Sequence, residues 1–574
     1  MRLALPGHGA SRGSALGRAR VRQPHALDVV ESRIDDVEAE IARLHEAIDT
    51  VRAEMHDLRE RLHGALAQEV GEFLDLHALL LDDPELLHGL DELIRTGRYS
   101  ADYALRLQRD RIAGVFTGMD DAYLRSRIDD IDQVIGRIHA ALHRREADVL
   151  GIAGEVLVCE NVSPSELAQL QAQGVMAVVT AAGSTLSHSA ILARSLHLPL
   201  VVGAAEALLK INDGDVLAVD GGSGLIVREP NADDLRAHQA RLREQKRERR
   251  QLNRLRREPT RTRDGVDIRL YANAESREDV AEAHALGAAG VGLYRTEFLF
   301  LQREALPDED EQFRAYRDLV LGMTGRIVTI RTLDLGADKA DRSGLALRGE
   351  PNPALGLRGV RLSLARPDVF ETQLRAIVRA SGYGPLRILL PMVSGREEVL
   401  AARALLSRVH AALRAQGQPV ADAIALGAMI EVPSAAIALP AFIADVDFLS
   451  VGTNDLVQYL LAADRNNDAL GELYSPLHPA VLRLLHDTLR IARRRGTPVA
   501  VCGEMAGDPA LVPLLLALGL EELSLHPATL LEVRRAIRAS DLGALRASAP
   551  RLLKARDRAA IERWIASAAP APGH

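Results

Sequence analysis

The chain has 574 residues, of which 47% are hydrophobic, 26% charged and 3% aromatic, a composition typical of globular proteins. Its formal net charge of -8 argues against a basic surface for nucleic acid, and its two cysteines, Cys159 and Cys502, are too few for a disulfide framework. Since no apolar run approaches the roughly 18 residues of a membrane span, the sequence predicts a cytoplasmic protein that binds no nucleic acid and crosses no membrane.

The first long pattern in the chain is helical. Within residues 26–146, apolar residues recur at spacings of three and four, as at Val37, Ile41, Leu44 and Ile48. This spacing places them on one face of a helix. An Asp-Asp-Pro sequence interrupts the pattern, which then resumes. We predict a small helical bundle over residues 26–146.

Short apolar runs follow the bundle and alternate with helical stretches. They are EVLVCE, GVMAVVT, LPLVVGA and DVLAVDG, and such alternation predicts an α/β domain. We assign residues 147–230 to this domain together with residues 1–25, where SRGSALGRARVR is expected to supply one more strand. The helical bundle is then an insertion. Residues 231–261 are charged on nearly every face, which is typical of a helix that links two domains.

Residues 262–574 contain eight short apolar runs, each followed by a helical pattern: IRLYAN, GVGLYR, IVTIRT, RILLPMV, LGAMIEV, VDFLSVG, PVAVCGE and EELSLHP. Eight strand-helix units predict a (β/α)8 barrel with its active site at the C-terminal ends of the strands. The predicted fold class is thus multidomain α/β, with the barrel last. Polar residues gather at these strand ends, namely Arg295, Arg331, Glu431, Asn454, Asp455 and Cys502.

A histidine opens one helical pattern of the α/β domain. His188 follows a small, polar turn that begins at Gly183, and Ile191 and Leu192 continue the helical pattern. The start of a helix presents unpaired backbone N–H groups and a positive dipole end, which suit a phosphoryl group on the ring. His188 is therefore a candidate covalent phosphoryl carrier. A capping or surface histidine would have the same position.

The residues around His188 resemble a known family. The stretch SHSAILARSLHLPLVVG from Ser187 is similar to the phosphohistidine segment of enzyme I of the phosphoenolpyruvate-dependent phosphotransferase system. Further similar motifs follow in the family's order, among them LYRTEFLFLQREALPDEDEQFRAY, RTLDLGADK, EVPSAA, SVGTNDLVQYLLAADRNND and VCGEMAGDP. The resemblance implies a magnesium-dependent phosphotransferase that moves the phosphoryl group of phosphoenolpyruvate to His188. The phosphoryl group then passes to a histidine of a small phosphocarrier protein, and pyruvate is released.

Phosphoenolpyruvate carries a phosphate and a carboxylate, so its site needs several fixed cations. Arginine suits this task because its planar fork binds oxyanions bidentately and stays charged. The candidates are Arg295, Arg331, Arg358 and Arg465. The resemblance assigns phosphoenolpyruvate binding to all of these except Arg358, which we expect to join them. Lys339 is either a further cation near the site or part of a structural salt bridge.

Two carboxylates and a thiol complete the predicted site. Glu431 and Asp455 come from different strand ends, which fits Mg²⁺ held by one or two carboxylates, and the resemblance implies this use. It also implies that Asn454 contacts the substrate phosphate, where we expect Asp455 to contribute as well. A thiol with a tuned pKa can protonate the enolate that remains. Cys502 is given this role by the resemblance, although a cysteine after an apolar run is also a common core residue.

The chain departs from the family pattern at three places. Leu186 replaces the threonine two residues before the histidine, Leu357 stands where many members have tryptophan, and residues 524–528 read SLHPA. We expect changed detail around the substrate.

The two predicted sites lie in different domains, so His188 has to visit the barrel and then leave it. The helical bundle is expected to dock the carrier, and the resemblance suggests a homodimer through the barrel. Sugar and nitrogen-regulatory branches share these motifs. A pyruvate-phosphate dikinase or phosphoenolpyruvate synthase would need an ATP-binding domain, and the sequence has no P-loop motif. A sensor that binds phosphoenolpyruvate without turnover is the non-enzymatic alternative.

Overall fold

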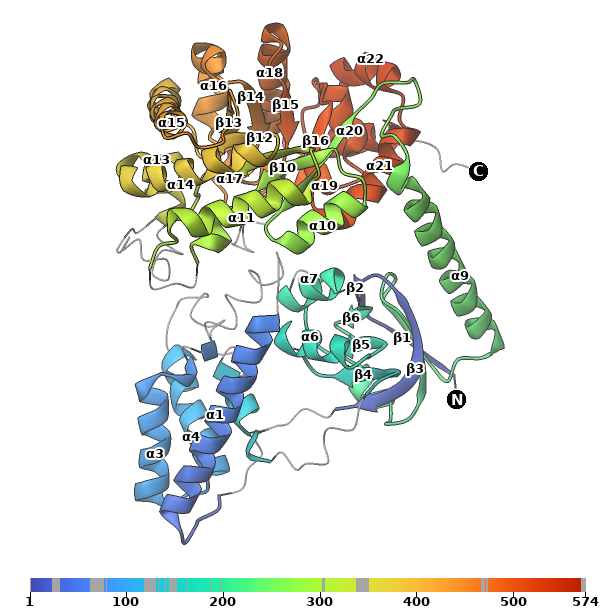
Figure 1. The fold of residues 1–574 in the computed structure, drawn as a ribbon. Coiled ribbons are helices and arrows are strands. Elements are labelled where there is room, and N and C mark those ends of the chain that lie inside the picture. The colour runs from blue at the N-terminus through green and yellow to red at the C-terminus, as the bar shows by residue number, and fades with distance from the viewer. Residues whose placement is uncertain are drawn as a thin grey trace. The chain divides into compact units, whose positions relative to one another are not determined.

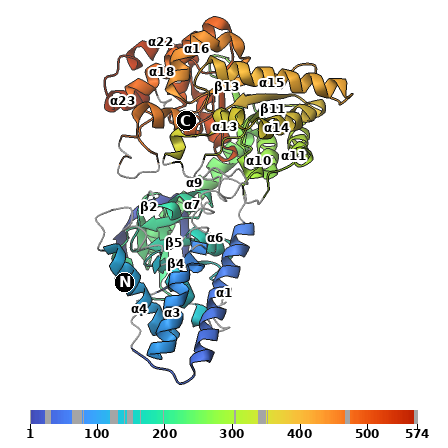
Figure 2. The ribbon, with the colours of Figure 1, turned by 90° about the vertical axis from the view of Figure 1, so that its left-hand side faces the viewer.

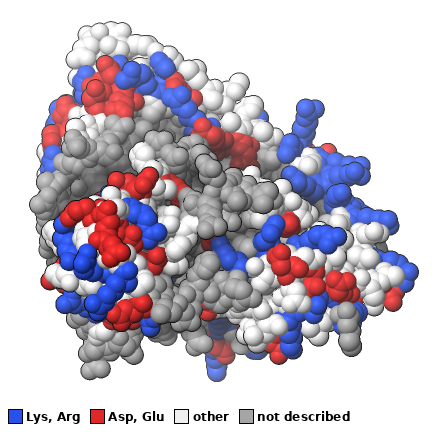
Figure 3. Space-filling model, turned by 90° about the horizontal axis from the view of Figure 1, so that it is seen from below, with Lys and Arg blue, Asp and Glu red and all other residues white. Residues whose placement is uncertain are grey.

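The computed structural model describes residues 2–22, 31–61, 77–78, 80–117, 131–132, 134–139, 141–143, 152–162, 164–185, 187–196, 198–301, 305–336, 350, 352–465, 470 and 473–568. The chain divides into two compact units, Met1–Arg247 and Glu248–His574. Figure 3 shows acidic and basic side chains mixed over much of one face. None of the helices in the described ranges has the length and apolar character that crossing a bilayer requires.

The first unit contains an eight-stranded sheet in the order β1-β8-β7-β3-β4-β5-β6-β2 (Figure 1). Its strands are β1 (Leu3–Pro6), β2 (His8–Ser11), β3 (Ser14–Val21), β4 (Glu155–Cys159), β5 (Ala177–Thr180), β6 (Leu200–Val202), β7 (Val216–Asp220) and β8 (Leu225–Arg228). Strands β3, β4, β5 and β6 run parallel to one another, and β7 pairs antiparallel with β3. The start of the chain is thus joined to strands from beyond residue 150.

This sheet has more strands than the sequence predicts. One strand is expected from the opening residues, whereas the structure has three, β1, β2 and β3, and a further strand, β8, near the end of the unit. The first two strands, LALP and HGAS, are only four residues long and are separated by Gly7. Such short segments carry too little alternation to be recognised as strands.

The helical part of the first unit includes α1 (Val37–Arg61), α3 (Pro84–Gly97) and α4 (Ala101–Thr117), which lie side by side in both Figure 1 and Figure 2. Helix α3 begins where the Asp-Asp-Pro sequence interrupts the pattern. The Asp83 side chain accepts a hydrogen bond from the N–H of Glu85, and Pro84 takes the first helical position. Its inner face buries Leu86, Leu90 and Ile94.

Three short helices cover the sheet: α6 (Pro164–Ala172), α7 (His188–Ser195) and α8 (Ala207–Lys210). The polar stretch predicted as a linker forms α9 (Ala232–Arg254), followed by a 3-10 turn, Leu255–Arg257. Near its start, Asp234 pairs with Arg2, and Nδ1 of His238 lies 2.7 Å from the hydroxyl of Ser14. These contacts attach the beginning of α9 to the sheet unit.

The second unit is a closed barrel of eight parallel strands in the order β10-β11-β12-β13-β14-β15-β16-β9. Its strands are β9 (Arg269–Ala274), β10 (Gly290–Tyr294), β11 (Ile327–Arg331), β12 (Leu386–Leu390), β13 (Ala425–Ile430), β14 (Phe448–Val451), β15 (Val499–Val501) and β16 (Glu522–Leu525). Each falls on one of the eight predicted apolar runs. The predicted fold class, multidomain α/β with a C-terminal (β/α)8 barrel, is confirmed.

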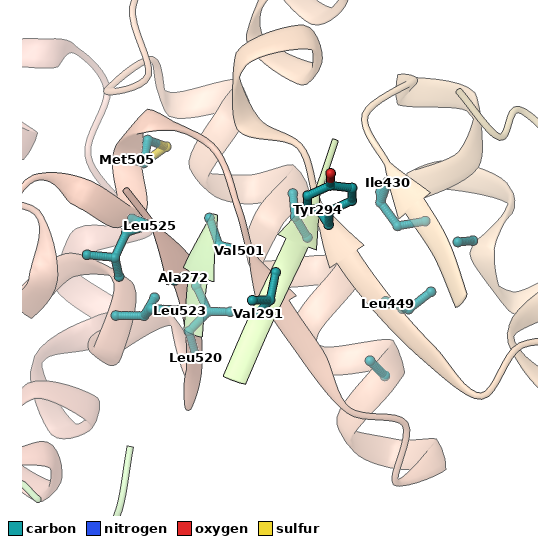
Figure 4. Packing of buried hydrophobic residues seen from close by; sticks show 14 of the residues in the cluster. Ala272, Val291, Tyr294, Ile430, Leu449, Val501, Met505, Leu520, Leu523 and Leu525 are labelled. Atoms are coloured by element: carbon teal, nitrogen blue, oxygen red, sulfur yellow. The ribbon is translucent and has the colours of Figure 1, made fainter. Parts of the chain in front are cut away.

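Helices surround the barrel and bury its outer face, and Figure 4 shows part of this packing around Val291, Leu449 and Leu523. They are α10 (Arg277–Ala285), α11 (Glu309–Gly322), α13 (Gly359–Ala365), α14 (Pro367–Ala380), α15 (Arg396–Ala415), α16 (Pro433–Phe442), α17 (Thr453–Leu461), α18 (Pro479–Arg495), α19 (Glu504–Gly507), α20 (Val512–Leu518), α21 (Leu530–Ala539), α22 (Leu542–Leu552) and α23 (Arg558–Ala568).

The interior of the barrel is filled by side chains, as in other barrels of this type. Arg387 donates to the hydroxyl of Thr329 at 2.7 Å, and its guanidinium lies 4.2 Å from the ring centre of Phe448. Phe448 packs in turn with Met429 and Cys502 in one buried cluster. Cys502 directly follows β15. The packed interior of the barrel therefore extends to the strand ends, where the polar residues lie.

Candidate active site

The predicted polar residues stand where the strands of the barrel end. Arg331 is the last residue of β11, and Arg295, Glu431 and Cys502 directly follow β10, β13 and β15. Because the strands are parallel, all of these ends lie at the same mouth of the barrel. The charges of Glu431, Arg331 and Arg295 all influence the pKa of Cys502, so the structure brings these four residues together.

Arg331 is held by two carboxylates that the sequence analysis did not select. Its Nη2 donates to Oε1 of Glu297 at 2.9 Å, and its Nη1 lies 3.2 Å from Oδ2 of Asp334. Burial acts to lower the pKa of Arg331, but Glu297 and Asp334 outweigh it and raise the pKa. The guanidinium is therefore a fixed, permanently charged group. The sequence signal for both carboxylates was their place in two quoted motifs: Asp334 lies in RTLDLGADK and Glu297 in LYRTEFLFLQREALPDEDEQFRAY.

Asp334 joins a second arginine to the site. Nε and Nη2 of Arg358 donate to its two carboxylate oxygens at 3.1 and 2.9 Å, which is a bidentate pair. Although burial acts to raise the pKa of Asp334, Arg331 and Arg358 outweigh it and lower the pKa to about 2. Arg358 also donates to the hydroxyl of Tyr459 and reaches Oδ2 of Asp455 at 3.4 Å. The predicted Arg358 is thus part of the cluster.

Backbone geometry next to Arg358 requires a glycine. Gly359 has a φ of +58°, and a Cβ at this position would lie 2.6 Å from Cβ of Met392 and 3.3 Å from Oδ1 of Asp334. Another residue would be strained at this positive φ, and its Cβ would press against Met392 beside the Arg358–Asp334 pair.

Glu431 is the most enclosed acid of the site, with 1% of its surface exposed. Its Oε1 accepts a hydrogen bond from the N–H of Met392 at 2.6 Å. Burial raises the pKa of Glu431 to about 8, and the charges of Asp455 and Asp334 add to this effect. A Cβ at Gly452 would lie 2.7 Å from Oε2 of Glu431. A larger residue at this position would therefore clash with the Glu431 carboxylate.

Asn454 and Asp455 lie in the first turn of α17, directly after β14. The side chain of Asn454 makes a reciprocal pair with Glu504: Nδ2 donates to Oε1 at 2.9 Å, and Oδ1 accepts from the backbone N–H at 2.9 Å. Tyr474 donates from its hydroxyl to the carbonyl of Asn454 at 3.1 Å. The Asn454 amide is therefore fixed by α19, which follows the Cys502 strand.

The donor set at Glu431 fits a divalent cation. Glu431 and Asp455 are carboxylates from neighbouring strand ends, and burial together with the charge of Asp455 raises the pKa of Glu431. A cation between them would remove this repulsion, and hard oxygen ligands are what Mg²⁺ prefers. The residues therefore fit the predicted metal.

Cys502 is buried, and burial raises the pKa of its thiol to about 11. Its Sγ lies 3.4 Å from the carbonyl oxygen of Val451, to which it donates. The carbonyl of Cys502 accepts from Asn273 at 3.0 Å, and Asn273 accepts from the hydroxyl of Ser524 at 2.6 Å. Ser524 belongs to the SLHPA segment that departs from the family pattern. This segment therefore contacts the Cys502 backbone indirectly, through Asn273.

The two remaining arginines are more accessible. Arg295 pairs with the buried Glu275 through its Nη1. Arg465 is exposed beyond α17; its backbone N–H donates to Oε1 of Gln458, and its charge acts on Tyr474. The Arg465 side chain is not part of the buried cluster. Lys339 lies outside the described residues.

The predicted phosphoryl carrier opens helix α7. Ser187 precedes it with an extended backbone (φ -64°, ψ 155°), and its side chain accepts from the N–H of Ala190 at 3.2 Å. Ser189 donates to the carbonyl of Val162 at 2.7 Å, which fixes the first turn to the segment that follows β4. His188 is the first residue of the helix, as the sequence predicts, while its side chain and the whole of Leu186 lie outside the described residues.

The chain is similar to known proteins over nearly its whole length. Models of the PEP-utilising enzymes match three segments: the N-terminal domain at residues 6–127, the mobile domain at 151–224 and the PEP-binding domain at 249–542. The chain is 44% identical over 552 residues to a phosphoenolpyruvate-protein phosphotransferase of Cupriavidus necator, with 94% of each chain covered. Proteins of the same name from Geobacillus stearothermophilus and Bacillus subtilis are 41% and 40% identical, covering 92% and 93% of this chain and 92% and 94% of theirs.

Proposed function

The chain belongs to the phosphoenolpyruvate-protein phosphotransferases, enzyme I of the phosphoenolpyruvate-dependent phosphotransferase system, and from this premise we propose how its own residues perform the transfer. The phosphoryl group of phosphoenolpyruvate passes to His188 and from there to a histidine of a small phosphocarrier protein, with release of pyruvate. The observation that carries the proposal is the buried cluster of arginines and carboxylates at the mouth of the barrel.

The arginines bind the two anionic groups of the substrate. Arg331 and Arg358 are held by Asp334, so their guanidinium groups are oriented before the substrate arrives, and no reorganisation is needed during the reaction. Arg295 and Arg465 are more accessible and complete the set at its outer edge. Asn454, fixed by Glu504, contacts the phosphate with its amide, and Asp455 lies beside it.

Glu431 and Asp455 hold Mg²⁺ in this proposal. When bound, the ion stabilises negative charge on the oxygens of the transferring phosphoryl group. The buried carboxyl of Glu431 has to lose its proton to serve as a ligand, while Asp334 stays ionised and keeps the arginines in place.

Cys502 donates a proton to the enolate. Because burial raises the pKa of its thiol to about 11, the group is protonated at neutral pH, as a general acid has to be. The packed interior beneath it excludes water from that side.

His188 accepts the phosphoryl group at the start of α7, where backbone N–H groups favour an anion.

We propose the domain limits predicted from the sequence. Residues 1–25 and 147–230 form the domain that carries the histidine, and residues 26–146 form the helical domain that docks the carrier. Residues 231–261 link these domains to the barrel, residues 262–574, which binds phosphoenolpyruvate. We also propose a homodimer through the barrel, which the family resemblance suggests. The cytoplasmic location stays a prediction, and sugar transport is the first role to test, with nitrogen regulation as the alternative.

The test is to incubate the full-length protein with phosphoenolpyruvate and Mg²⁺, without ATP. We expect pyruvate release and an acid-labile mass gain of one phosphoryl group, both absent in His188→Ala. The matched control is His238→Ala, a histidine of the same unit that contacts Ser14 on the sheet. A requirement for ATP, or binding without pyruvate release, would overturn the proposal.

A further inference from the structure

A cluster of two histidines and an aspartate lies in the helical part of the first unit, and none of the three side chains is used in the reaction proposed above. Nε2 of His143 lies 2.6 Å from Oδ1 of Asp102, and Nε2 of His139 lies 3.4 Å from the same oxygen. The two imidazole rings have centroids 4.6 Å apart. Two side chains from one segment therefore converge on a single carboxylate oxygen from another.

The local structure explains this convergence. Asp102 lies in the first turn of α4, and His139 and His143 are four residues apart in a segment that is helical at 134–139 and 141–142. Side chains at this spacing share one face of a helix. Two histidines at positions i and i+4 are a common arrangement for binding one metal ion.

The distances suit a small transition-metal ion. The ligand atoms of the three residues all lie within 4.8 Å of one another, and this is the one such group of His, Cys, Asp or Glu side chains in the described part of the chain. In a tetrahedral zinc site with bonds of about 2.0–2.1 Å, ligand atoms stand roughly 3.3 Å apart. The 3.4 Å separation of Asp102 and His139 already matches this value.

The surroundings keep one oxygen of Asp102 directed at the histidines. Arg43 lies 3.3 Å from the other oxygen, Oδ2, and also pairs with Glu40 at 2.8 Å. The side chains of Asp102 and His139 are 14% and 16% exposed, whereas His143 is 54% exposed. Two ligands are thus partly enclosed, and the third faces solvent, where an ion and a water ligand can enter.

We propose that Asp102, His139 and His143 bind a divalent transition-metal ion and that Zn²⁺ is the best match. Two imidazole nitrogens and a carboxylate oxygen are ligands that zinc accepts, with water at the fourth position. The bound ion joins α4 to the segment of residues 134–143 and stabilises the helical part of the unit. It is separate from the Mg²⁺ site of the barrel, which contains only oxygen ligands.

The test is a zinc titration of the full-length protein after chelator treatment, read by competition with a chromophoric zinc indicator. We expect His143→Ala and Asp102→Asn each to lose one bound Zn²⁺ per chain relative to the unsubstituted protein. His143→Cys should retain it, because a thiolate also binds zinc. The matched control is His45→Ala. His45 contacts Asp91 at 3.0 Å in the same helical region, and the described residues offer no third ligand there, so its loss should leave the zinc count unchanged.

A second measurement separates metal binding from simple hydrogen bonding. Zn²⁺ should raise the thermal midpoint of the unsubstituted protein and of His45→Ala but not of His143→Ala. Equal zinc counts in all variants, or an equal thermal shift, would overturn the proposal. Because the three residues do not belong to the phosphoenolpyruvate site, pyruvate release in the absence of the carrier should be unchanged in His143→Ala, so failure here is distinguishable from failure of the proposed function.

Discussion

The two regions that the proposed reaction joins are built differently. In the barrel, buried charges hold one another across long stretches of sequence: Arg358 contacts Asp334, 24 residues away, and Asp455, 97 residues away. At the start of the histidine helix, the side-chain contacts are instead single hydrogen bonds between neutral groups: Ser187 accepts from the N–H of Ala190, and Ser189 donates to the carbonyl of Val162. The barrel site is a charge cluster organised by the strands, whereas the histidine depends on how one helix begins.

This difference predicts how each region responds to substitution. A change in the barrel cluster leaves other buried charges without partners, and such losses are large. A change at the start of α7 removes one capping hydrogen bond, and such losses are small. The following substitutions test the comparison, from the largest expected effect to the smallest.

Glu431→Gln is expected to have the largest effect. It should lower pyruvate formation roughly 10³-fold, or about 4 kcal/mol, because the amide cannot replace a carboxylate ligand. Since burial raises the pKa of Glu431 to about 8, the metal-free protein carries this carboxyl largely protonated at pH 7, and the amide should leave its thermal midpoint nearly unchanged. Thermal unfolding should show that Mg²⁺ no longer stabilises the variant.

The control is Glu522→Gln at the opposite end of the barrel, where Glu522 opens β16 and accepts from Arg269 at 2.6 Å. This variant should keep the response to Mg²⁺. Stabilisation of Glu431→Gln by Mg²⁺ as strong as that of the unsubstituted protein would contradict the ligand assignment.

Cys502→Ser should lower the rate of pyruvate release roughly 10²-fold, the usual contribution of a positioned general acid. The serine hydroxyl fills the same place but is a much weaker acid. Cys159→Ser is the matched control, because Cys159 is also buried at a strand end but lies in the other unit. The measurement is the steady-state rate of pyruvate release by both variants. Equal rates would mean that Cys502 is a core residue and not the proton donor.

These two regions also show what the sequence could predict. The strand ends of the barrel followed from eight apolar runs, so the places of Arg331, Glu431 and Cys502 could be predicted. Asp334 and Glu297 were missed although both lie in the quoted motifs, because a motif does not record which arginine each carboxylate meets after folding. The short strands β1 and β2 were missed for a related reason: each has four residues and is fixed by partners late in the unit.

Asp334→Asn tests the missed part of the site. Removing the charge that orients Arg331 and Arg358 should raise KM for phosphoenolpyruvate roughly 10-fold to 100-fold, because misplaced binding groups lose that much. The pKa of Asp334 is lowered to about 2 from its ordinary 3.8, so its contribution to stability is complete above about pH 3.8 and is lost as the pH falls toward 2. Denaturant unfolding should show the gap between the two proteins shrinking over that range.

Asp368→Asn provides the comparison for this test. Asp368 forms a similar bidentate pair with Arg366, but its side chain is 65% exposed. An exposed pair contributes little, so KM should not change. A similar KM for Asp334→Asn would mean that the arginines hold their positions without Asp334.

The smallest expected effect is at the histidine segment. Ser187→Ala removes the side chain that caps α7 and should cost about 1 kcal/mol of stability in the first unit. The same energy shifts the population of a formed first turn about fivefold, so phosphorylation of His188 by phosphoenolpyruvate should slow by less than about tenfold. Ser276→Ala is the control, because Ser276 caps α10 in the barrel through the N–H of Asp279 at 3.2 Å. It should lose a similar stability without slowing phosphorylation, since the helix it caps carries no phosphoryl acceptor. If Ser187→Ala instead slowed phosphorylation of His188 100-fold, the upper end of the effect expected of Asp334→Asn on KM, the histidine segment would depend on its contacts as strongly as the barrel site does.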